Sequence, residues 1–177
     1  MPQTSAVEWI DASVTEVRRS AGDELPVQKY IMILAERDGA RRLPMWIGPA
    51  EASALALALE SAEVPRPFTY KLAAGLVAAA GSAVSEVRIT RLLAPVFYAS
   101  VIVQGPNGPQ EVDSRPSDAV NLALVTGVPI RIDSELFSVV TPADCAEEIS
   151  SFPVTTADIA AEAQQRIREF SHGAPGA

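Results

Sequence analysis

Three charged side chains stand close together in the segment 113–118. Asp113, Arg115 and Asp118 place a cation between two carboxylates, where a strand is expected to end and a helix to begin. Carboxylate oxygens are the ligands that hard cations prefer, and a guanidinium can bind a phosphate through two parallel hydrogen bonds. The amides at a helix start can also receive an anion. These residues therefore predict a site for a divalent cation, a phosphate or both.

The rest of the composition narrows the metal chemistry. The 177 residues include one His and one Cys, which excludes multi-histidine sites, thiolate zinc clusters and an internal disulfide. Any metal would be a hard cation such as magnesium or manganese, held by carboxylates. The candidate ligands are Glu51, Glu60, Glu111, Asp113 and Asp118. Of these we expect Glu51, Asp113 and Asp118 to hold the metal, and we expect no organic cofactor.

A structural role for the same residues is the competing interpretation. Asp118 in the first turn of a helix is an ordinary capping residue. Arg115 could pair with Asp113 or Glu111 and brace the turn before the helix. Glu51 could simply match the dipole at the start of an earlier helix. Residue types alone do not decide between the two roles.

The overall charge limits the partners. Fourteen Lys and Arg against 22 Asp and Glu give a formal charge of −8, which argues against a surface that grips polyanions generally. Nucleic acid is kept as a candidate partner, although the charge weakens that prediction. Trp46 and Phe68 could stack on bases, but aromatic residues are only 6% of the chain, which favours core positions for both.

Targeting and membrane signals are not expected. The first residues lack a basic segment followed by an apolar stretch and a cleavage site. The apolar stretches around 54–59 and 72–80 are shorter than a membrane span. We therefore expect a cytoplasmic protein with no membrane partner.

The apolar pattern indicates which elements position the charged residues. Alternating or two-faced apolar stretches predict strands, and helical spacing with capping residues predicts helices. Strands are expected over 7–14, 27–35, 42–47, 86–90, 96–103, 111–113 and 129–132, and helices over 49–62, 69–80, 116–125, from 142 and from 155. This order predicts an α+β domain over residues 1–140, with a mixed, largely antiparallel β-sheet and helices packed on one side. Residues 141–177 are expected to form a C-terminal helical extension and a frayed tail.

The helix expected over 49–62 is apolar nearly all round. Ala52, Leu55 and Leu59 form one stripe, and Leu57 projects from the opposite side. Such a helix is usually buried on two sides, and one small domain seldom supplies both. We therefore expect a second subunit against Leu57, and hence a homo-oligomer, most simply a dimer.

Several blocks of the chain, taken in order, resemble the bifunctional nuclease domain. Ordered motifs are more specific than any single one, and the resemblance runs from about Val7 to Phe137. Its motifs are Leu43-Pro44-Met45-Trp46-Ile47-Gly48, Glu51-Ala52 with a helix ending at Glu60, Arg66-Pro67-Phe68-Thr69, Phe97-Tyr98-Ala99, Val112-Asp113-Ser114-Arg115-Pro116-Ser117-Asp118-Ala119 and Pro129-Ile130.

The resemblance implies a function as well as a fold. Bacterial members of this family look like compact α+β homo-oligomers, and plant members are credited with cutting both DNA and RNA. The implied activity is metal-assisted hydrolysis of phosphodiesters. Carried onto the matching blocks, it implies catalytic roles for Asp113, Arg115 and Asp118 and substrate contacts from Arg66, Thr69 and Ser117.

One block departs from the family pattern. The family usually has Thr-His-Asp-Leu where this chain has Thr69-Tyr70-Lys71-Leu72. A phenol and an ammonium therefore replace an imidazole and a carboxylate. Tyr70 and Lys71 could supply an acid and a phosphate contact, but we expect them to be surface residues at a helix start. The alternative function is a non-catalytic homo-oligomeric module that binds a ligand or a protein through the Arg115 turn.

Overall fold

The computed structural model describes residues 7–21, 28–39, 41–139 and 142–172. The boundary expected between residues 140 and 141 lies outside the described residues. Among those residues, no helix is both long enough and apolar enough to cross a membrane. The elements follow in the order β1 (Trp9–Arg19), β2 (Tyr30–Glu36), β3 (Arg42–Ile47), α1 (Pro49–Leu59), α2 (Thr69–Ala79), β4 (Ala83–Leu93), β5 (Val96–Gly105), β6 (Gly108–Ser114), α3 (Pro116–Thr126), β7 (Ile130–Asp133), a 3-10 turn η1 (Ser134–Ser138), α4 (Pro142–Ser150) and α5 (Thr156–His172).

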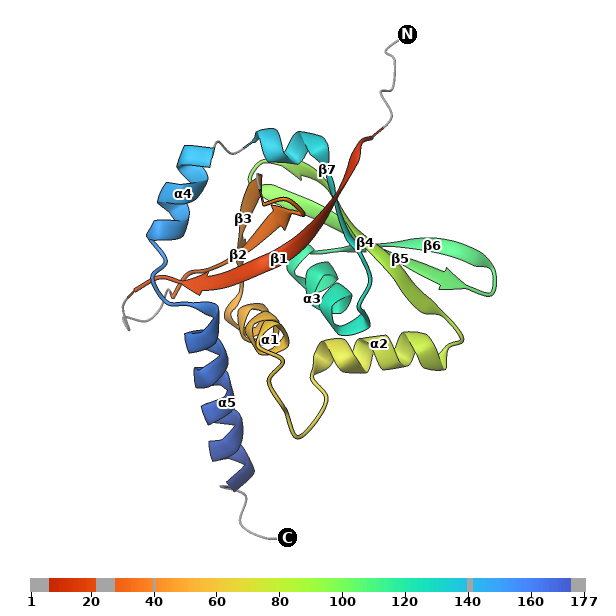
Figure 1. Cartoon of the computed structure of the whole chain (residues 1–177). Helices are drawn as coiled ribbons and strands as arrows, with labels where there is room; N and C mark the ends of the chain where they lie inside the picture. Colours follow the sequence, from red (N-terminus) through yellow and green to blue (C-terminus); the bar gives the residue numbers. More distant parts are fainter. Residues whose placement is uncertain (1–6, 22–27, 40, 140–141, 173–177) are drawn as a thin grey trace.

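The strands form a seven-stranded sheet with the order β3-β2-β1-β7-β4-β5-β6 (Figure 1). Neighbouring strands are antiparallel except for β4 and β7, which are parallel. Helices α1, α3 and α5 share the main core on one face of the sheet, and α2 packs at its end against α3 and β4. This arrangement confirms the predicted α+β class, with a mixed, largely antiparallel sheet and C-terminal helices.

Strand β2 explains why one helix lies on the other face. Met32 and Leu34 belong to the main core, whereas Ile31 and Ile33 join Phe152 in a second apolar cluster. Successive side chains of a strand point to opposite faces, so both faces of β2 need a cover. Helix α4, next to β3, and the segment after it supply the second cover.

Helix α1 is buried on two sides within one chain. Leu55 faces the main core and is fully buried, and Leu57 on the other side is only 5% exposed. Helix α5 packs along α1, with Ile159 and Ala160 in the same core. The expectation that a second subunit covers Leu57 is therefore wrong, because the C-terminal helix of the same chain covers it. The dimer itself stays a prediction.

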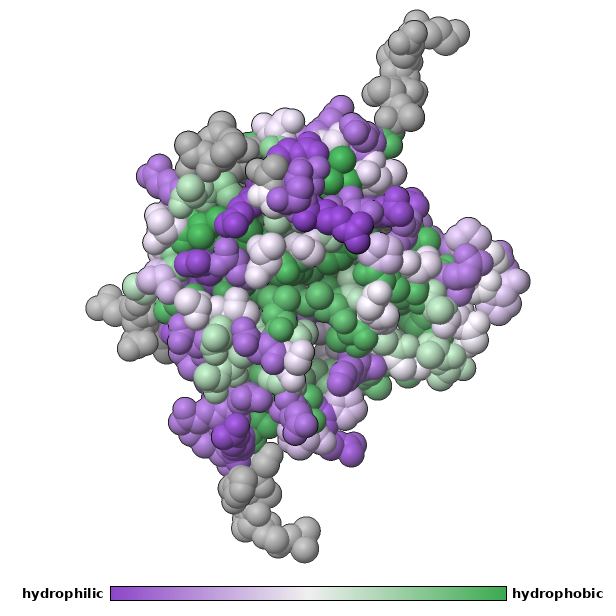
Figure 2. All heavy atoms as spheres, in the orientation of Figure 1, coloured by the Kyte–Doolittle hydropathy of each residue, from purple (hydrophilic) through white to green (hydrophobic). Residues whose placement is uncertain are grey.

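Helix α2 has no such cover. None of its described residues is buried. Leu72 and Leu76 are 58% and 62% exposed, and with Phe68 they form a row at four-residue spacing, which we call the α2 stripe. Figure 2 shows apolar side chains gathered over the middle of this face of the molecule, over α1 and α2. The expectation of core positions for Trp46 and Phe68 is wrong, since these residues are 57% and 40% exposed.

Candidate active site

Two helix starts meet at the centre of the site. Helix α1 begins after the extended Gly48 and α3 after the extended Arg115, and each then has a proline, which suits the first turn because it lacks an N–H. Glu51 and Asp118 lie in the first turns of these two helices. The positive end of a helix dipole stabilises a carboxylate there. The fold therefore brings together two acids that are 67 residues apart by their numbers (118 − 51).

A buried amide holds the two helices at a fixed spacing. Asn121 is 1% exposed, and its Nδ2 donates to the carbonyl oxygens of Ser117 at 2.9 Å and Glu51 at 3.3 Å. A buried polar group is tolerated only where it is hydrogen-bonded. Asn121 thus links the first turn of α3 to the first turn of α1.

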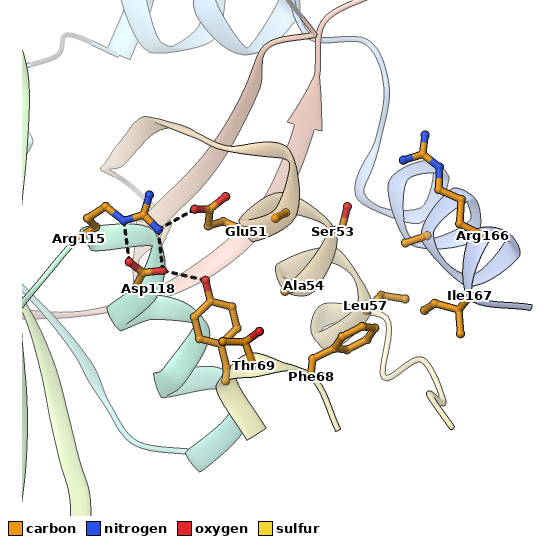
Figure 3. Close-up of a pocket in the computed structure, with 13 residues that line it drawn as sticks. Glu51, Ser53, Ala54, Leu57, Phe68, Thr69, Arg115, Asp118, Arg166 and Ile167 are labelled. Atoms are coloured by element: carbon orange, nitrogen blue, oxygen red, sulfur yellow. Dashed lines mark hydrogen bonds and ion pairs between the residues drawn. The ribbon is translucent and has the colours of Figure 1, made fainter. Parts of the chain in front are cut away.

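Arg115 joins the two carboxylates (Figure 3). Its Nε donates to Oδ2 of Asp118 at 2.7 Å, and its Nη2 donates to Oδ1 of Asp118 at 3.1 Å and to Oε1 of Glu51 at 2.7 Å. The hydrogen bond to Asp118, followed by that to Glu51, raises the pKa of Arg115 above its ordinary value. Arg115 therefore does not pair with Asp113 or Glu111, and that alternative is wrong.

Arg115 and Glu51 each keep one polar atom that forms no hydrogen bond with the described residues. Nη1 of Arg115 donates to no described residue, and 66% of this side chain is exposed. Oε2 of Glu51 likewise accepts no hydrogen bond from the described residues and lies directly over Gly48. A side-chain carbon at Gly48 would collide with this oxygen. Glycine at position 48 therefore leaves room for the end of the Glu51 side chain, which a larger residue there would force to shift.

Tyr70 is part of the site, although its sequence position predicted a surface residue at a helix start. Its hydroxyl donates to Oδ1 of Asp118 at 2.8 Å, and the side chain is half-buried. Burial, and then the hydrogen bond to Asp118, raises the pKa of the phenol above its ordinary value. Tyr70 therefore stays protonated near neutral pH and remains a donor. The expectation of a plain surface residue is wrong, because the start of α2 faces the start of α3.

A cleft of about 460 Å³ opens beside the ion pairs. Glu51, Tyr70, Arg115 and Asp118 line its polar end, and Thr69 lies beside them. The other end is largely apolar, with Leu57, Phe68 and Ile167 turned toward one another in Figure 3, and the exposed Arg166 of α5 also lines it. The cleft thus combines a charged end on α1, α2 and α3 with an apolar end that α5 helps to close.

The other predicted site residues lie outside this cleft. Asp113 is exposed on β6, and its side chain forms no hydrogen bond or ion pair with the described residues. Arg66 is exposed in the connector between α1 and α2 and does not line the cleft. Ser117 is buried and lines a second cleft of about 390 Å³, which Arg115 also borders. The fold therefore gathers Glu51, Thr69, Arg115 and Asp118, but not Asp113 or Arg66.

The carboxylates do not fit a bound metal as they are arranged. Among the described residues, no group of three or more Asp, Glu, His or Cys side chains is placed to hold an ion. Glu51 and Asp118 both face a guanidinium, and Asp113 does not join them. A dication would need several oxygen ligands free of such a partner. Magnesium or manganese at Glu51 and Asp118 would therefore have to compete with Arg115 for their oxygens.

Comparison with known proteins places the chain in a family. The model of the bifunctional nuclease domain matches residues 32–143. The chain belongs to the bifunctional nuclease domain family. A protein of Mycobacterium tuberculosis, described as uncharacterised, is 41% identical over 115 residues, covering 65% of this chain and 68% of that protein. Bifunctional nuclease 1 of Oryza sativa subsp. japonica is 28% identical over 131 residues, covering 69% of this chain and 40% of the rice protein.

The family match covers most of the site of this bifunctional nuclease domain protein. The matched range includes Glu51, Tyr70, Arg115 and Asp118. Ile167, on α5, lies beyond it. The charged end of the cleft is thus built from family elements, whereas its apolar end is completed by a helix outside the match. The resemblance read from the sequence is confirmed.

Proposed function

We propose that this bifunctional nuclease domain protein hydrolyses phosphodiester bonds of DNA or RNA in the cleft at the start of α1, α2 and α3. The proposal rests on the Arg115 guanidinium, which has one edge bound by carboxylates and the other exposed. Its Nε and Nη2 edge is held by Asp118 and Glu51, and its exposed Nη1 is left for a ligand. A guanidinium held in this way presents two N–H donors to a phosphate oxygen at little further cost in side-chain freedom.

Glu51 is the proposed general base. Its Oε2 is free of hydrogen bonds from the described residues and lies at the same mouth as Nη1 of Arg115. In this step Oε2 takes a proton from water while the water oxygen bonds to phosphorus. The bond from phosphorus to the leaving oxygen breaks, and that oxygen takes a proton from solvent. Arg115 stabilises the charge that grows on the phosphoryl oxygens.

Asp118 and Tyr70 are positioning residues in this proposal. Both oxygens of Asp118 accept hydrogen bonds from Arg115, and Oδ1 also accepts from Tyr70. Asp118 therefore has less capacity than Glu51 to bind a water. Its role is to hold the guanidinium plane, and the phenol in turn holds the Asp118 carboxylate.

Cleavage by Glu51→Gln tests the proposal, with Glu63→Gln as the matched control because Glu63 is exposed and outside the cleft. Purified wild-type protein should cleave single-stranded DNA or RNA. Glu51→Gln should lower the rate by about 100-fold or more, and Glu63→Gln should not change it. Equal rates for the two variants would refute the assignment of Glu51.

The same assay, run with magnesium, with manganese and with a chelator, tests the metal expectation. A metal would have to displace Arg115 from Glu51 and Asp118 before it could bind them. Full activity in chelator is the result that the arrangement of the ion pairs favours. Activity that depends strictly on added metal would show that the carboxylates rearrange during the reaction.

A second candidate function is a homo-oligomeric binding module, and we propose the α2 stripe as its interface. The stripe exposes Phe68, Leu72 and Leu76, and Lys71 is the one charged residue within α2. A cluster of large exposed apolar side chains often marks a contact surface. Two copies with a formal charge of −8 each would repel over much of their surface, but would meet without carboxylates along this stripe.

Light scattering with Leu72→Glu tests the dimer. Wild type should have the mass of two chains, and Leu72→Glu should have the mass of one because four carboxylate oxygens would be buried in the paired stripes. Glu63→Gln serves as a surface control that should keep the mass of the wild type. A monomeric wild-type protein would rule the interface out.

A further inference from the structure

A second arginine lines the cleft at the end opposite to Arg115. Arg166 is an exposed residue of α5, and it lines the largely apolar end beside Ile167. Figure 3 shows Arg115 and Arg166 on opposite sides of α1, with Ser53 and Leu57 of α1 between them. The cleft therefore carries a cation at each end.

The acid expected to pair with Arg166 is already bound elsewhere. Glu162 lies four residues earlier on α5, which is the spacing and the order that favour an ion pair on a helix. Its two carboxylate oxygens instead accept hydrogen bonds from Nη1 and Nη2 of Arg19 on β1, at 2.6 and 2.9 Å. Glu169, three residues after Arg166, accepts a hydrogen bond from Gln165 at 2.9 Å. Arg166 itself forms no hydrogen bond or ion pair with the described residues, so its guanidinium is available to a ligand.

The floor between the two arginines leaves room for a ligand. It is a face of α1 with small side chains, those of Ala50, Ser53 and Ala54. Of the described residues that line the cleft, the acids are Glu51 and Asp118, and both are bonded to Arg115 at the other end. An anion on Arg166 therefore meets no unpaired carboxylate from the described lining.

The two arginines are separated by the width of a helix. Helix α1 packs against α3 on one flank and against α5 on the other (Figure 1). The axes of packed helices lie about 8–10 Å apart, so a ligand that touches both guanidinium groups has to cross α1. A single phosphate group is too short for this. A nucleic-acid strand is long enough, and it carries a negative charge on every nucleotide.

We infer that Arg166 binds a second phosphate of a DNA or RNA strand whose scissile phosphate lies on Arg115, an inference that rests on the proposed phosphodiesterase function. The strand crosses α1, and the part of it between the two phosphates lies over the small side chains of that helix. Arg166 is a positioning residue, since it adds affinity for a polynucleotide and takes no part in the reaction at phosphorus. Because α5 lies beyond the residues that match the family model, this phosphate subsite is built by an element outside the match.

Kinetics with two substrates test the subsite. Arg166→Ala should raise KM for oligothymidylate by about tenfold and keep kcat, because it removes one charge-assisted phosphate contact. Its rate with bis(4-nitrophenyl) phosphate, which has one phosphate, should equal that of wild type. Arg166→Lys should recover part of the affinity because a cation remains. Arg37→Ala, which removes an exposed arginine outside the cleft, should change neither substrate. Equal losses on both substrates in Arg166→Ala would refute the subsite.

Binding of fluorescein-labelled oligothymidylate to the Glu51→Gln variant measures affinity without turnover. Adding Arg166→Ala should weaken this binding by about tenfold. It should also lower the slope of log affinity against log salt by about 0.7, the value for one phosphate contact on a single strand. Adding Arg37→Ala should leave the affinity and the slope unchanged.

The outcomes separate this inference from the proposed reaction. Binding that depends on Arg166, without any cleavage by wild type, would support the subsite and refute the nuclease. Cleavage by wild type, with the affinity and the salt slope unchanged by Arg166→Ala, would refute the subsite and leave the nuclease standing.

Discussion

Helices α1 and α2 have the same length and a similar composition, but different surroundings. Each is eleven residues long and rich in Ala and Leu. In α1, Leu55 and Leu57 are buried on two sides, against the main core and against α5. In α2, the apolar residues that face α3 and β4 are only half-buried, and Leu72 and Leu76 face outward.

The difference shows that an all-round apolar helix does not by itself indicate a second subunit. The cover of α1 comes from α5, more than a hundred residues later in the same chain. The outer face of helix α2 is not covered in this way by the described residues. A partner would therefore remove apolar surface from water at α2 and not at α1. This outer face borders the apolar end of the cleft, because Phe68 belongs to both.

The largest expected effect is a difference in the free energy of unfolding between a variant of α1 and a variant of α2. Leu57→Ala removes a buried side chain and should lower the free energy of unfolding by about 2–5 kcal/mol. Leu76→Ala removes an exposed side chain and should change the stability of the monomer by no more than about 0.5 kcal/mol. Urea unfolding at low protein concentration measures both. Similar losses for the two variants would mean that α2 is covered as well as α1.

The next comparison is between the cleavage rates of two glycine variants, one at the start of α1 and one in the middle of α2. Gly48→Ala requires the end of the Glu51 side chain to shift without changing a charge, and should lower the cleavage rate by up to about tenfold as the charge-assisted hydrogen bond to Arg115 weakens. Gly75→Ala is the matched control, since a side-chain carbon there meets no atom within 4 Å among the described residues. That control should keep full activity.

The Gly75→Ala control should also make α2 slightly more stable, because alanine loses less backbone freedom than glycine in a helix. An equal loss of activity in both variants would indicate general damage to the fold. Full activity in Gly48→Ala would contradict the contact between Glu51 and Arg115 as a requirement for the reaction.

The smallest effect concerns Tyr70, the α2 side chain that donates a hydrogen bond to Asp118. The pKa of Tyr70 is raised in the folded protein above its ordinary value of 10.0. The folded state therefore holds this proton more tightly than the unfolded state, so the stabilisation is complete below about pH 10 and is lost as the pH rises toward the folded pKa. Stability should fall above pH 10, and Tyr70→Phe should fall less steeply over that range.

Ultraviolet titration of tyrosinate gives a direct readout, because the chain has three tyrosines. Tyr70 should titrate above its ordinary pKa, and Tyr70→Phe should remove that step. An unchanged titration curve, after correction for the number of tyrosines, would mean that the phenol is not buried against Asp118.

The fold class and the core of the site could be predicted from local patterns. Apolar alternation predicted the strands, and the 113–118 segment pointed to Arg115 and Asp118, because strand ends and helix starts are encoded by neighbouring residues. Long-range contacts could not be predicted in this way. Tyr70 reaches an acid 48 residues away, and Asp113 turned out to lie on β6 outside the cleft although it is close to Arg115 in sequence.

The same limit applies to Arg115 and its partners. Two acids close to it in sequence were weighed as its partners, whereas the fold supplies one acid from its own helix and Glu51 from α1. The packing of α1 against α3, through Asn121, decides this pairing. Only the tertiary structure carries that information.

Single-turnover cleavage of single-stranded substrate by Arg115→Ala tests whether hydrolysis requires this guanidinium. The rate should be at least about 100-fold below that of wild type, because the donor that meets the phosphoryl oxygens is gone. Arg37→Ala, which removes an exposed arginine in the β2–β3 turn, should cleave at the wild-type rate. Equal rates for wild type and Arg115→Ala would show that Arg115 does not stabilise the phosphoryl oxygens.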